Sequence, residues 1–246
     1  MAAGFSFSVL GPVRAWRDGA EVNLGSPQQR TVLAAILLRA GRGYVLSIRE
    51  DGLDASRFRR LADRAARARA TGDHGSAAGL LNEALALWKG EPLAGITGRF
   101  AETRRVVLGE MRLAAAEDWA GDNLALGRHA GVIPALASLT SDHPYSERLR
   151  ELHMLALYRA GRQAEALAVF NEVRHLLATE LGIDPGPRLQ DLHLRVLNAD
   201  PALMDVRPLS RARSSSPAGS GRSARHALGC AARGCAGRAF PRRPPR

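Results

Sequence analysis

A repeat with a period of 34 residues constrains the fold of this chain more than any other feature of its sequence. Residues 127–130 (GRHA) are echoed by residues 161–164 (GRQA), and Leu136 is echoed by Phe170. This period is typical of tetratricopeptide arrays, in which each unit is a helix–turn–helix. One unit cannot bury its apolar stripe alone, so units stack on one another and present a surface to a partner. The repeat therefore predicts a helical scaffold rather than an enzyme.

Apolar residues recur with helical spacing through residues 54–200. After Gly161 they stand at i, i+4, i+7 and i+11, which predicts one face of a helix: Ala166, Phe170, Val173 and Leu177. The same pattern, with its caps and breakers, predicts the remaining helices. They are expected over 54–70, from Asp73 or Ser76 to Trp88, over 100–126, 129–139 and 146–160, and from an Asp184 cap with Pro185 in the first position through Val196. We therefore expect about seven or eight antiparallel helices in an all-helical domain.

The first 50 residues show a different pattern. Apolar and polar residues alternate over 5–10 and again over 13–16, and a hairpin turn signal at Asp18 and Gly19 precedes a third strand over 21–24. Ser26 and Pro27 predict the start of a helix over 28–39. Residues 44–48 predict one more short strand. This β-meander with a single helix is too small to hold much of a core by itself.

Together these motifs resemble the antibiotic-regulatory family of bacterial transcriptional activators. The residues that match are 7–12 (FSVLGP), 24–30 (LGSPQQR), 43–46 (GYVL), 155–167 (LALYRAGRQAEAL) and 180–187 (ELGIDPGP). The resemblance covers residues 5–203. It implies an OmpR-like winged-helix DNA-binding domain followed by a tetratricopeptide-like bacterial transcriptional activator domain over 54–203. It also implies DNA binding and activation of transcription by contact with RNA polymerase.

The N-terminal part departs from that family pattern. In the family, the first helix of the winged domain leads into two more, of which the last is the recognition helix, and the wing hairpin follows. Here the helix ending near Arg39 meets the wing-like Gly43 and Tyr44 almost at once, so no segment is left to reach base edges. We therefore expect residues 5–49 to be a truncated winged-helix remnant. Its DNA-contact candidates are Arg30 and Arg42, and the alternative for both is a solvated surface arginine.

The positive charge of the chain is expected to belong to its C-terminal tail alone. The net charge is +11, and residues 207–246 hold ten arginines and no acidic residue, which leaves +1 for residues 1–206. Residues 204–246 are rich in Ser, Gly, Ala and Pro, which predicts disorder. Such a tail can bind phosphates without sequence preference. The alternative is an unselected extension, such as a shifted reading frame in GC-rich coding.

No catalytic, cofactor or metal site is expected. The lone lysine, Lys89, lacks the glycine pattern of a phosphate-binding loop, and the adjacent acids Glu117 and Asp118 are expected to be solvated. The only cysteines, Cys230 and Cys235, lie in the tail without a convincing set of four metal ligands. A cysteine-free core fits a reducing cytoplasm, and neither a leader peptide nor a membrane span is expected.

Three functional hypotheses follow. The first is a DNA-binding transcriptional regulator that contacts RNA polymerase, as the family resemblance implies. The second is a protein-interaction or homodimerisation module without specific DNA binding, which the missing recognition helix favours. The third is a non-functional gene fragment.

Overall fold

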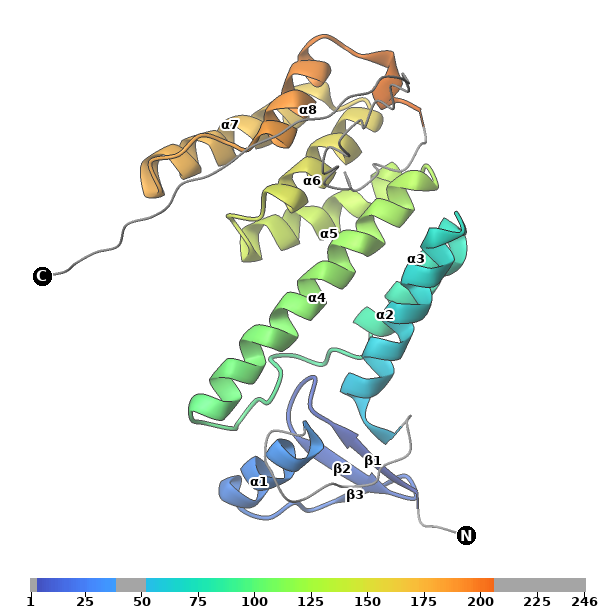
Figure 1. Ribbon diagram of the computed structural model, residues 1–246, viewed down its shortest axis with the longest axis vertical. Helices are drawn as coiled ribbons and strands as arrows, with labels where there is room; N and C mark the ends of the chain where they lie inside the picture. The colour runs from blue at the N-terminus through green and yellow to red at the C-terminus, as the bar shows by residue number, and fades with distance from the viewer. Residues whose placement is uncertain (1–3, 39–51, 206–246) are drawn as a thin grey trace, which may run out of the picture. The chain divides into compact units, whose positions relative to one another are not determined.

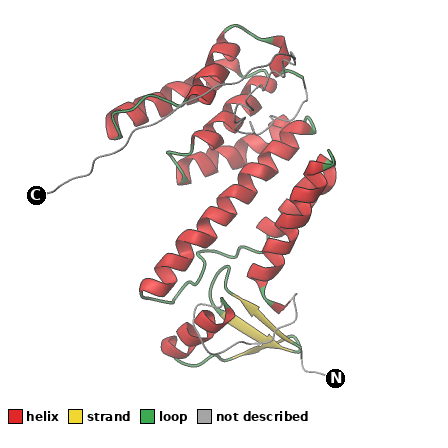
Figure 2. Cartoon of the chain, in the orientation of Figure 1, coloured by secondary structure: helices red, strands yellow, loops and turns green. Residues whose placement is uncertain are grey.

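The computed structural model describes residues 4–38 and 52–205. Helices dominate it, and the strands are confined to the N-terminal end (Figures 1 and 2). The elements are β1 (Phe5–Ser8), β2 (Arg14–Arg17), β3 (Ala20–Val22), α1 (Pro27–Leu37), α2 (Asp54–Ala70), α3 (His74–Leu85), α4 (Arg99–Ala125), α5 (His129–Asp142), α6 (Glu147–Arg159), α7 (Gln163–Glu180), α8 (Pro187–Leu197) and the 3-10 turn η2 (Pro201–Leu203). The strand predicted over 44–48, Arg42 and the tail over 207–246 lie outside the described residues.

The three strands form the predicted antiparallel meander, in the order β1-β2-β3. Asp18 and Gly19 turn the chain between β2 and β3 with φ angles of 52° and 86°, as an Asp-Gly turn requires. β1 is shorter than predicted, because Val9 and Leu10 leave the sheet and are fully buried. Their carbonyl groups accept hydrogen bonds from the backbone N–H groups of Leu93 (3.0 Å) and Lys89 (2.9 Å) instead.

The start of α1 is also as predicted. Ser26 caps the helix by accepting a hydrogen bond from the backbone N–H of Gln29, and the Gln29 side chain accepts one from the Ser26 N–H at 2.8 Å. Pro27 occupies the first turn, where its missing N–H costs nothing.

The same glycine turn closes α2, α4 and α6. Gly72, Gly127 and Gly161 have φ angles of 82°, 76° and 78°, a conformation that glycine adopts without strain. In each turn the N–H of the following residue donates to the carbonyl five residues earlier, on Ala68, Asn123 and Leu157 respectively. This is the Schellman geometry. It confirms the repeat between Gly127 and Gly161, and it adds a third turn at Gly72 that the period does not reveal.

Helices that follow one another in sequence pack side by side. α2 packs on α3, α3 on α4, α5 on α6 and α6 on α7, while α8 contacts both α6 and α7. Nine of the 13 residues of α6 are buried, so this helix forms the centre of the C-terminal group. The predicted face of α7 is buried at Ala166, Phe170, Val173 and Leu177. Within the described range 52–205, the seven helices α2–α8 thus match the predicted number.

Three predicted helix boundaries are wrong. α5 continues to Asp142, three residues beyond its predicted end at Leu139, and the other two are the end of α3 and the start of α8. α3 ends at Leu85, because the Lys89 N–H donates to Leu10 rather than continuing a helix. Trp88 therefore lies in the following loop, where it is still buried and meets the Phe58 ring edge-on at 5.4 Å. α8 is capped by Gly186 instead of Asp184, because the Gly186 N–H donates to the Glu147 carboxylate on α6 at 2.7 Å.

A buried carboxylate joins α2, α3 and α4. Asp122 is 1% exposed and accepts two hydrogen bonds from the guanidinium of Arg69, both 2.8 Å, and lies 2.8 Å from His74 Nδ1. Arg69 also pairs with Asp118 at 2.8 Å, and Glu117 accepts a hydrogen bond from the Ser146 hydroxyl. The expectation that Glu117 and Asp118 are merely solvated is therefore wrong. Complete pairing of this kind is what makes a buried carboxylate tolerable.

Candidate nucleic-acid interface

Residues 4–38, which belong to the predicted winged-helix remnant, present an apolar helix face rather than a polar one. α1 buries Ala34 and Leu37, whereas Val32 on its other side is 60% exposed. A shallow hollow of about 350 Å³ on that side is lined by Gln28, Gln29, Val32, Leu33 and Ile36. A helix that reads a DNA groove carries polar side chains for base edges and phosphates. This face instead has the composition of a surface that packs against other helices.

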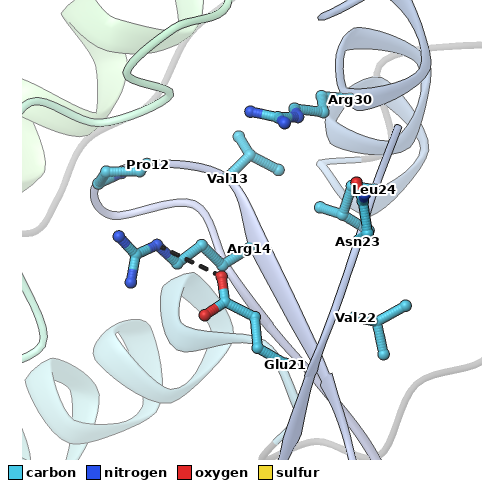
Figure 3. A pocket seen from close by; sticks show the side chains of 8 residues that line it. All are labelled: Pro12, Val13, Arg14, Glu21, Val22, Asn23, Leu24 and Arg30. Carbon is cyan, nitrogen blue, oxygen red and sulfur yellow. Dashed lines mark ion pairs between the residues drawn. The ribbon is translucent and has the colours of Figure 1, made fainter. Parts of the chain in front are cut away.

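A second hollow, of about 490 Å³, lies beside the sheet and the start of α1 (Figure 3). It is lined by Pro12, Val13, Arg14, Glu21, Val22, Asn23, Leu24 and Arg30. Arg14 and Glu21 point toward each other, with Nε and Oε1 3.8 Å apart, and both side chains are more than half exposed. An exposed ion pair of this length contributes little to stability. It nevertheless neutralises one of the two arginines in the hollow.

Arg30 is the only charged residue of α1. Its Nε donates to the Gly25 carbonyl at 3.2 Å, so the guanidinium folds back on the loop before the helix while the side chain stays exposed. Arg42, the other predicted DNA-contact candidate, lies outside the described residues. The structure therefore places one candidate, and it places it as a lone exposed cation.

Asp54 at the start of α2 joins the remnant to the helices. Its carboxylate accepts hydrogen bonds from the Ser8 hydroxyl (2.7 Å) and from the backbone N–H groups of Val9 and Leu10 (both 3.0 Å). Val9, Leu10 and Leu37 belong to the same apolar cluster as Phe58. Residues 4–38 are too few to enclose a core of their own, and they share the apolar core of α2–α4 instead. Sequence reasoning missed this role, because an aspartate that opens a helix looks like an ordinary first-turn acid.

Arg159 is a structural residue rather than a contact for a partner. It is 8% exposed, and its guanidinium donates to the carbonyls of Leu124 (3.1 Å), Leu203 (2.7 Å) and Asp205 (2.6 Å). Burial lowers its pKa. Arg159, the first of two arginines in the 155–167 motif, therefore holds the end of the described chain against α4 and α6.

Three histidines of the described chain serve packing. Burial lowers the pKa of His129, His153 and His193, and His193 stacks on Phe170 with ring centres 3.8 Å apart. Among residues 4–38 and 52–205, no group of three or more His, Cys, Asp or Glu side chains could hold a metal ion. No helix in these ranges is long and apolar enough to cross a membrane.

Comparison with known proteins matches this architecture to transcriptional regulators. The family described as bacterial transcriptional activator domain matches residues 53–197. Regulatory protein AfsR of Streptomyces coelicolor is 46% identical, over 81% of this chain and 25% of AfsR. Regulatory protein DnrI of Streptomyces peucetius is 38% identical, over 65% of this chain and 60% of DnrI. The chain thus spans about a quarter of AfsR and less than two thirds of DnrI.

A solved structure of a related regulator has a similar fold. Mycobacterium tuberculosis EmbR, in complex with a low-affinity phosphopeptide, superposes with a TM-score of 0.78 at 29% identity. The match covers 83% of this chain and 67% of EmbR.

The alignment with AfsR leaves many AfsR positions unmatched. It runs over 246 positions, whereas 81% of the 246-residue chain is about 199 residues, so about 47 positions of AfsR face no residue of this chain. The alignment with DnrI runs over 162 positions, and 65% of the chain is about 160 residues. Of these two alignments, only the longer one, with AfsR, therefore has many unmatched positions.

Proposed function

The chain belongs to the AfsR-type family of transcriptional regulators that carry a bacterial transcriptional activator domain, and we propose that it regulates transcription through protein contacts without reading a DNA sequence. As a bacterial regulator it would act in the cytoplasm, where the chromosome is. The observation that carries the proposal is the short connection between α1 and α2.

Too few residues separate these two helices to hold both further helices of the family's winged domain, of which the recognition helix is the second. α1 ends at Leu37 and α2 begins at Asp54, which leaves residues 38–53. Two helices of average length need about 22 residues before any wing hairpin is added. This limit holds whatever conformation the connection adopts. A winged-helix domain of the family type therefore does not fit into the chain.

Two further observations support an internal truncation. The unmatched AfsR positions total about 47, which is a number sufficient for two helices with their connections. The exposed Val32 and the apolar hollow beside it mark a face that such helices would cover. Both point to the loss of the element that reads base edges.

The helical domain, by contrast, is complete enough to bind a protein partner. The family match runs over residues 53–197 without a break, and the helices enclose a buried core, which favours a working module over a non-functional fragment. Leu194 and Leu197 lie on one face of α8 and are 57% and 51% exposed, so they offer apolar contact area. The family implies RNA polymerase as the partner, and a second copy of the chain is the alternative. EmbR, a relative with this fold, was solved in complex with a phosphopeptide, which supports a peptide or protein ligand for a regulator of this family.

The proposal is tested by comparing two DNA duplexes. We expect the chain, with and without residues 207–246, to bind a direct-repeat promoter of the family type no more than a few times better than random DNA at physiological salt. A preference of about a thousandfold or more, the lower edge of specific recognition, would contradict the proposal. Pull-down of purified RNA polymerase, with Leu194→Asp/Leu197→Asp as the variant, tests the protein contact.

A further inference from the structure

α2 has an unusual charge. It contains six arginines and only two acidic residues. Its buried face is formed by Ala55, Phe58, Leu61 and Ala65. Arg57, Arg64 and Arg67 are exposed and stand at spacings of seven and three residues, which places them together on the face away from this core. We call these three residues the α2 arginine stripe.

The α2 arginine stripe is not neutralised by the chain. Within the described residues, none of its three guanidinium groups forms an ion pair or hydrogen bond. Most arginines of α6–α8 have acidic partners: Arg148 and Arg188 pair with Glu151, Arg150 with Glu172, Arg162 with Glu165 and Arg195 with Asp200. On α2 itself, Asp54 is occupied by residues 8–10, which leaves Asp63 as the single free acid.

This arrangement costs the isolated protein stability. Like charges three or four residues apart on a helix repel, and screening by salt reduces the effect. An anionic partner beside these arginines would be attracted by the same positive charge. The net charge of residues 1–206 is only +1, but this total conceals a local concentration of positive charge on α2.

We propose that the α2 arginine stripe binds the phosphate backbone of duplex DNA without sequence preference. The exposed side chains of α2 include no large apolar residue: they are Ser56, Arg57, Arg59, Asp63, Arg64, Ala66, Arg67 and Ala70. Protein interfaces concentrate aromatic and apolar anchors at their centre, whereas protein–DNA interfaces are polar and strongly positive. The composition of this face therefore fits DNA and not an acidic protein.

The dimensions and position of the stripe also fit a duplex. Arg57 and Arg67 are about 15 Å apart along the helix axis, a length over which duplex DNA presents several phosphates. α2 begins beside β1, to which Asp54 is hydrogen-bonded, so the stripe continues from the side of the chain where the winged-helix remnant lies (Figure 1). The inference deepens the proposed function and rests on it for the choice of DNA as partner: a regulator that cannot read base edges still holds the backbone.

The test measures the salt dependence of binding to a random-sequence duplex, with the full chain. The variant Arg57→Gln/Arg64→Gln/Arg67→Gln should reduce the slope of log K against log[salt] by about 2–3, since each phosphate contact contributes about 0.9. Its affinity at about 0.1 M salt should fall by roughly tenfold or more. The control Arg99→Gln/Arg128→Gln/Arg174→Gln removes the same charge from exposed arginines of other segments. It should change the slope by less than about 1. The ten tail arginines are present in all three proteins, so their contribution cancels.

Three outcomes would overturn the inference. An unchanged slope in the α2 variant would remove DNA as its ligand, and an equal loss in both variants would reduce the effect to net charge. Loss of binding to poly-glutamate but not to DNA would assign the stripe to an acidic protein. Unchanged circular dichroism and unfolding midpoints in both variants confirm that the comparison is made on folded protein. A strong promoter preference of the parent chain would defeat the proposed function while leaving this slope difference intact, so the two failures are distinguishable.

Discussion

The two apolar cores of the described chain are built in different ways. The C-terminal core draws on α5–α8, the end of α4 and Leu203, and it is organised around α6, which is buried on almost every side. The N-terminal core combines α2, α3 and the first part of α4 with non-helical residues such as Val9, Leu10 and Val13. Trp119 of α4 packs against both cores.

The two cores differ in which segments of the chain they need in order to stay closed to solvent. Helices that repeat one turn geometry supply all the walls of the C-terminal core, so that core closes itself. The N-terminal core relies on a segment fastened through Asp54, and it leaves Val32 of α1 on the surface. Under the proposed deletion, the lost helices would leave apolar surface of α1 exposed, whereas the core that residues 8–10 complete stays closed.

The largest effect is expected from the centre of the C-terminal core. Leu152→Ala, at a fully buried position of α6, should lower the free energy of unfolding by about 2–5 kcal/mol, because it removes packed methyl groups and leaves a cavity. The matched control is Leu194→Ala on α8, which is 57% exposed and should change it by less than about 0.5 kcal/mol. Urea unfolding followed by circular dichroism measures both. Equal costs would show that α6 is not the closed centre of this core.

A smaller and more local effect is expected where the N-terminal core is fastened. Asp54→Ala removes the acceptor of the buried Val9 and Leu10 N–H groups, which should cost about 2–3 kcal/mol. Hydrogen exchange should accelerate across residues 4–38 while α6 and α7 keep their protection. Asp63→Ala, an exposed aspartate of the same helix, is the control and should leave exchange unchanged. If both variants exchange alike, the remnant is held by something other than Asp54.

Sequence patterns predicted what depends on neighbouring residues and missed what depends on distant ones. The apolar face of α7, the Ser26 cap and the glycine turns at 127 and 161 follow from local spacing and backbone preference, and all were predicted. The end of α3 was not, because it is decided by a hydrogen bond from Lys89 to Leu10, 79 residues earlier in the chain. The pairing of Asp122 with Arg69 and the α2 arginine stripe also require knowing which helix faces are covered.

Acid should weaken the C-terminal core in particular. Burial is the main cause that lowers the pKa of His153 on α6; Arg150 lowers it further, and Glu172 partly opposes this. The folded state therefore binds a proton less readily than the unfolded chain, so stability is complete above about pH 6.5 and falls as the pH drops below it, by at most roughly 1.4 kcal/mol per unit for one histidine. Urea unfolding at pH 7.5 and 5.5 should show this loss, and His153→Leu should reduce it. His175→Leu, on the exposed side of α7, should retain the full loss. A parent chain equally stable at both values would refute the prediction.

The smallest expected effects on stability come from three glycine-to-alanine substitutions, of which two should destabilise the chain and one should stabilise it. Gly161→Ala forces a φ of 78° on a residue with a Cβ and should cost about 1 kcal/mol, even though no atom lies within 4 Å of the added carbon. Gly127→Ala, its partner in the repeat, should cost the same. Gly109→Ala lies inside α4 with open space around its added Cβ, so it should stabilise the chain by about 0.5–1 kcal/mol through helix propensity. Thermal unfolding resolves shifts of this size. The repeat predicts that the first two shifts are equal, because both glycines close a helix in the same Schellman turn. Unequal shifts would mean that the two turns differ in strain, and a destabilising Gly109→Ala would mean that a partner surface lies against α4 at that point.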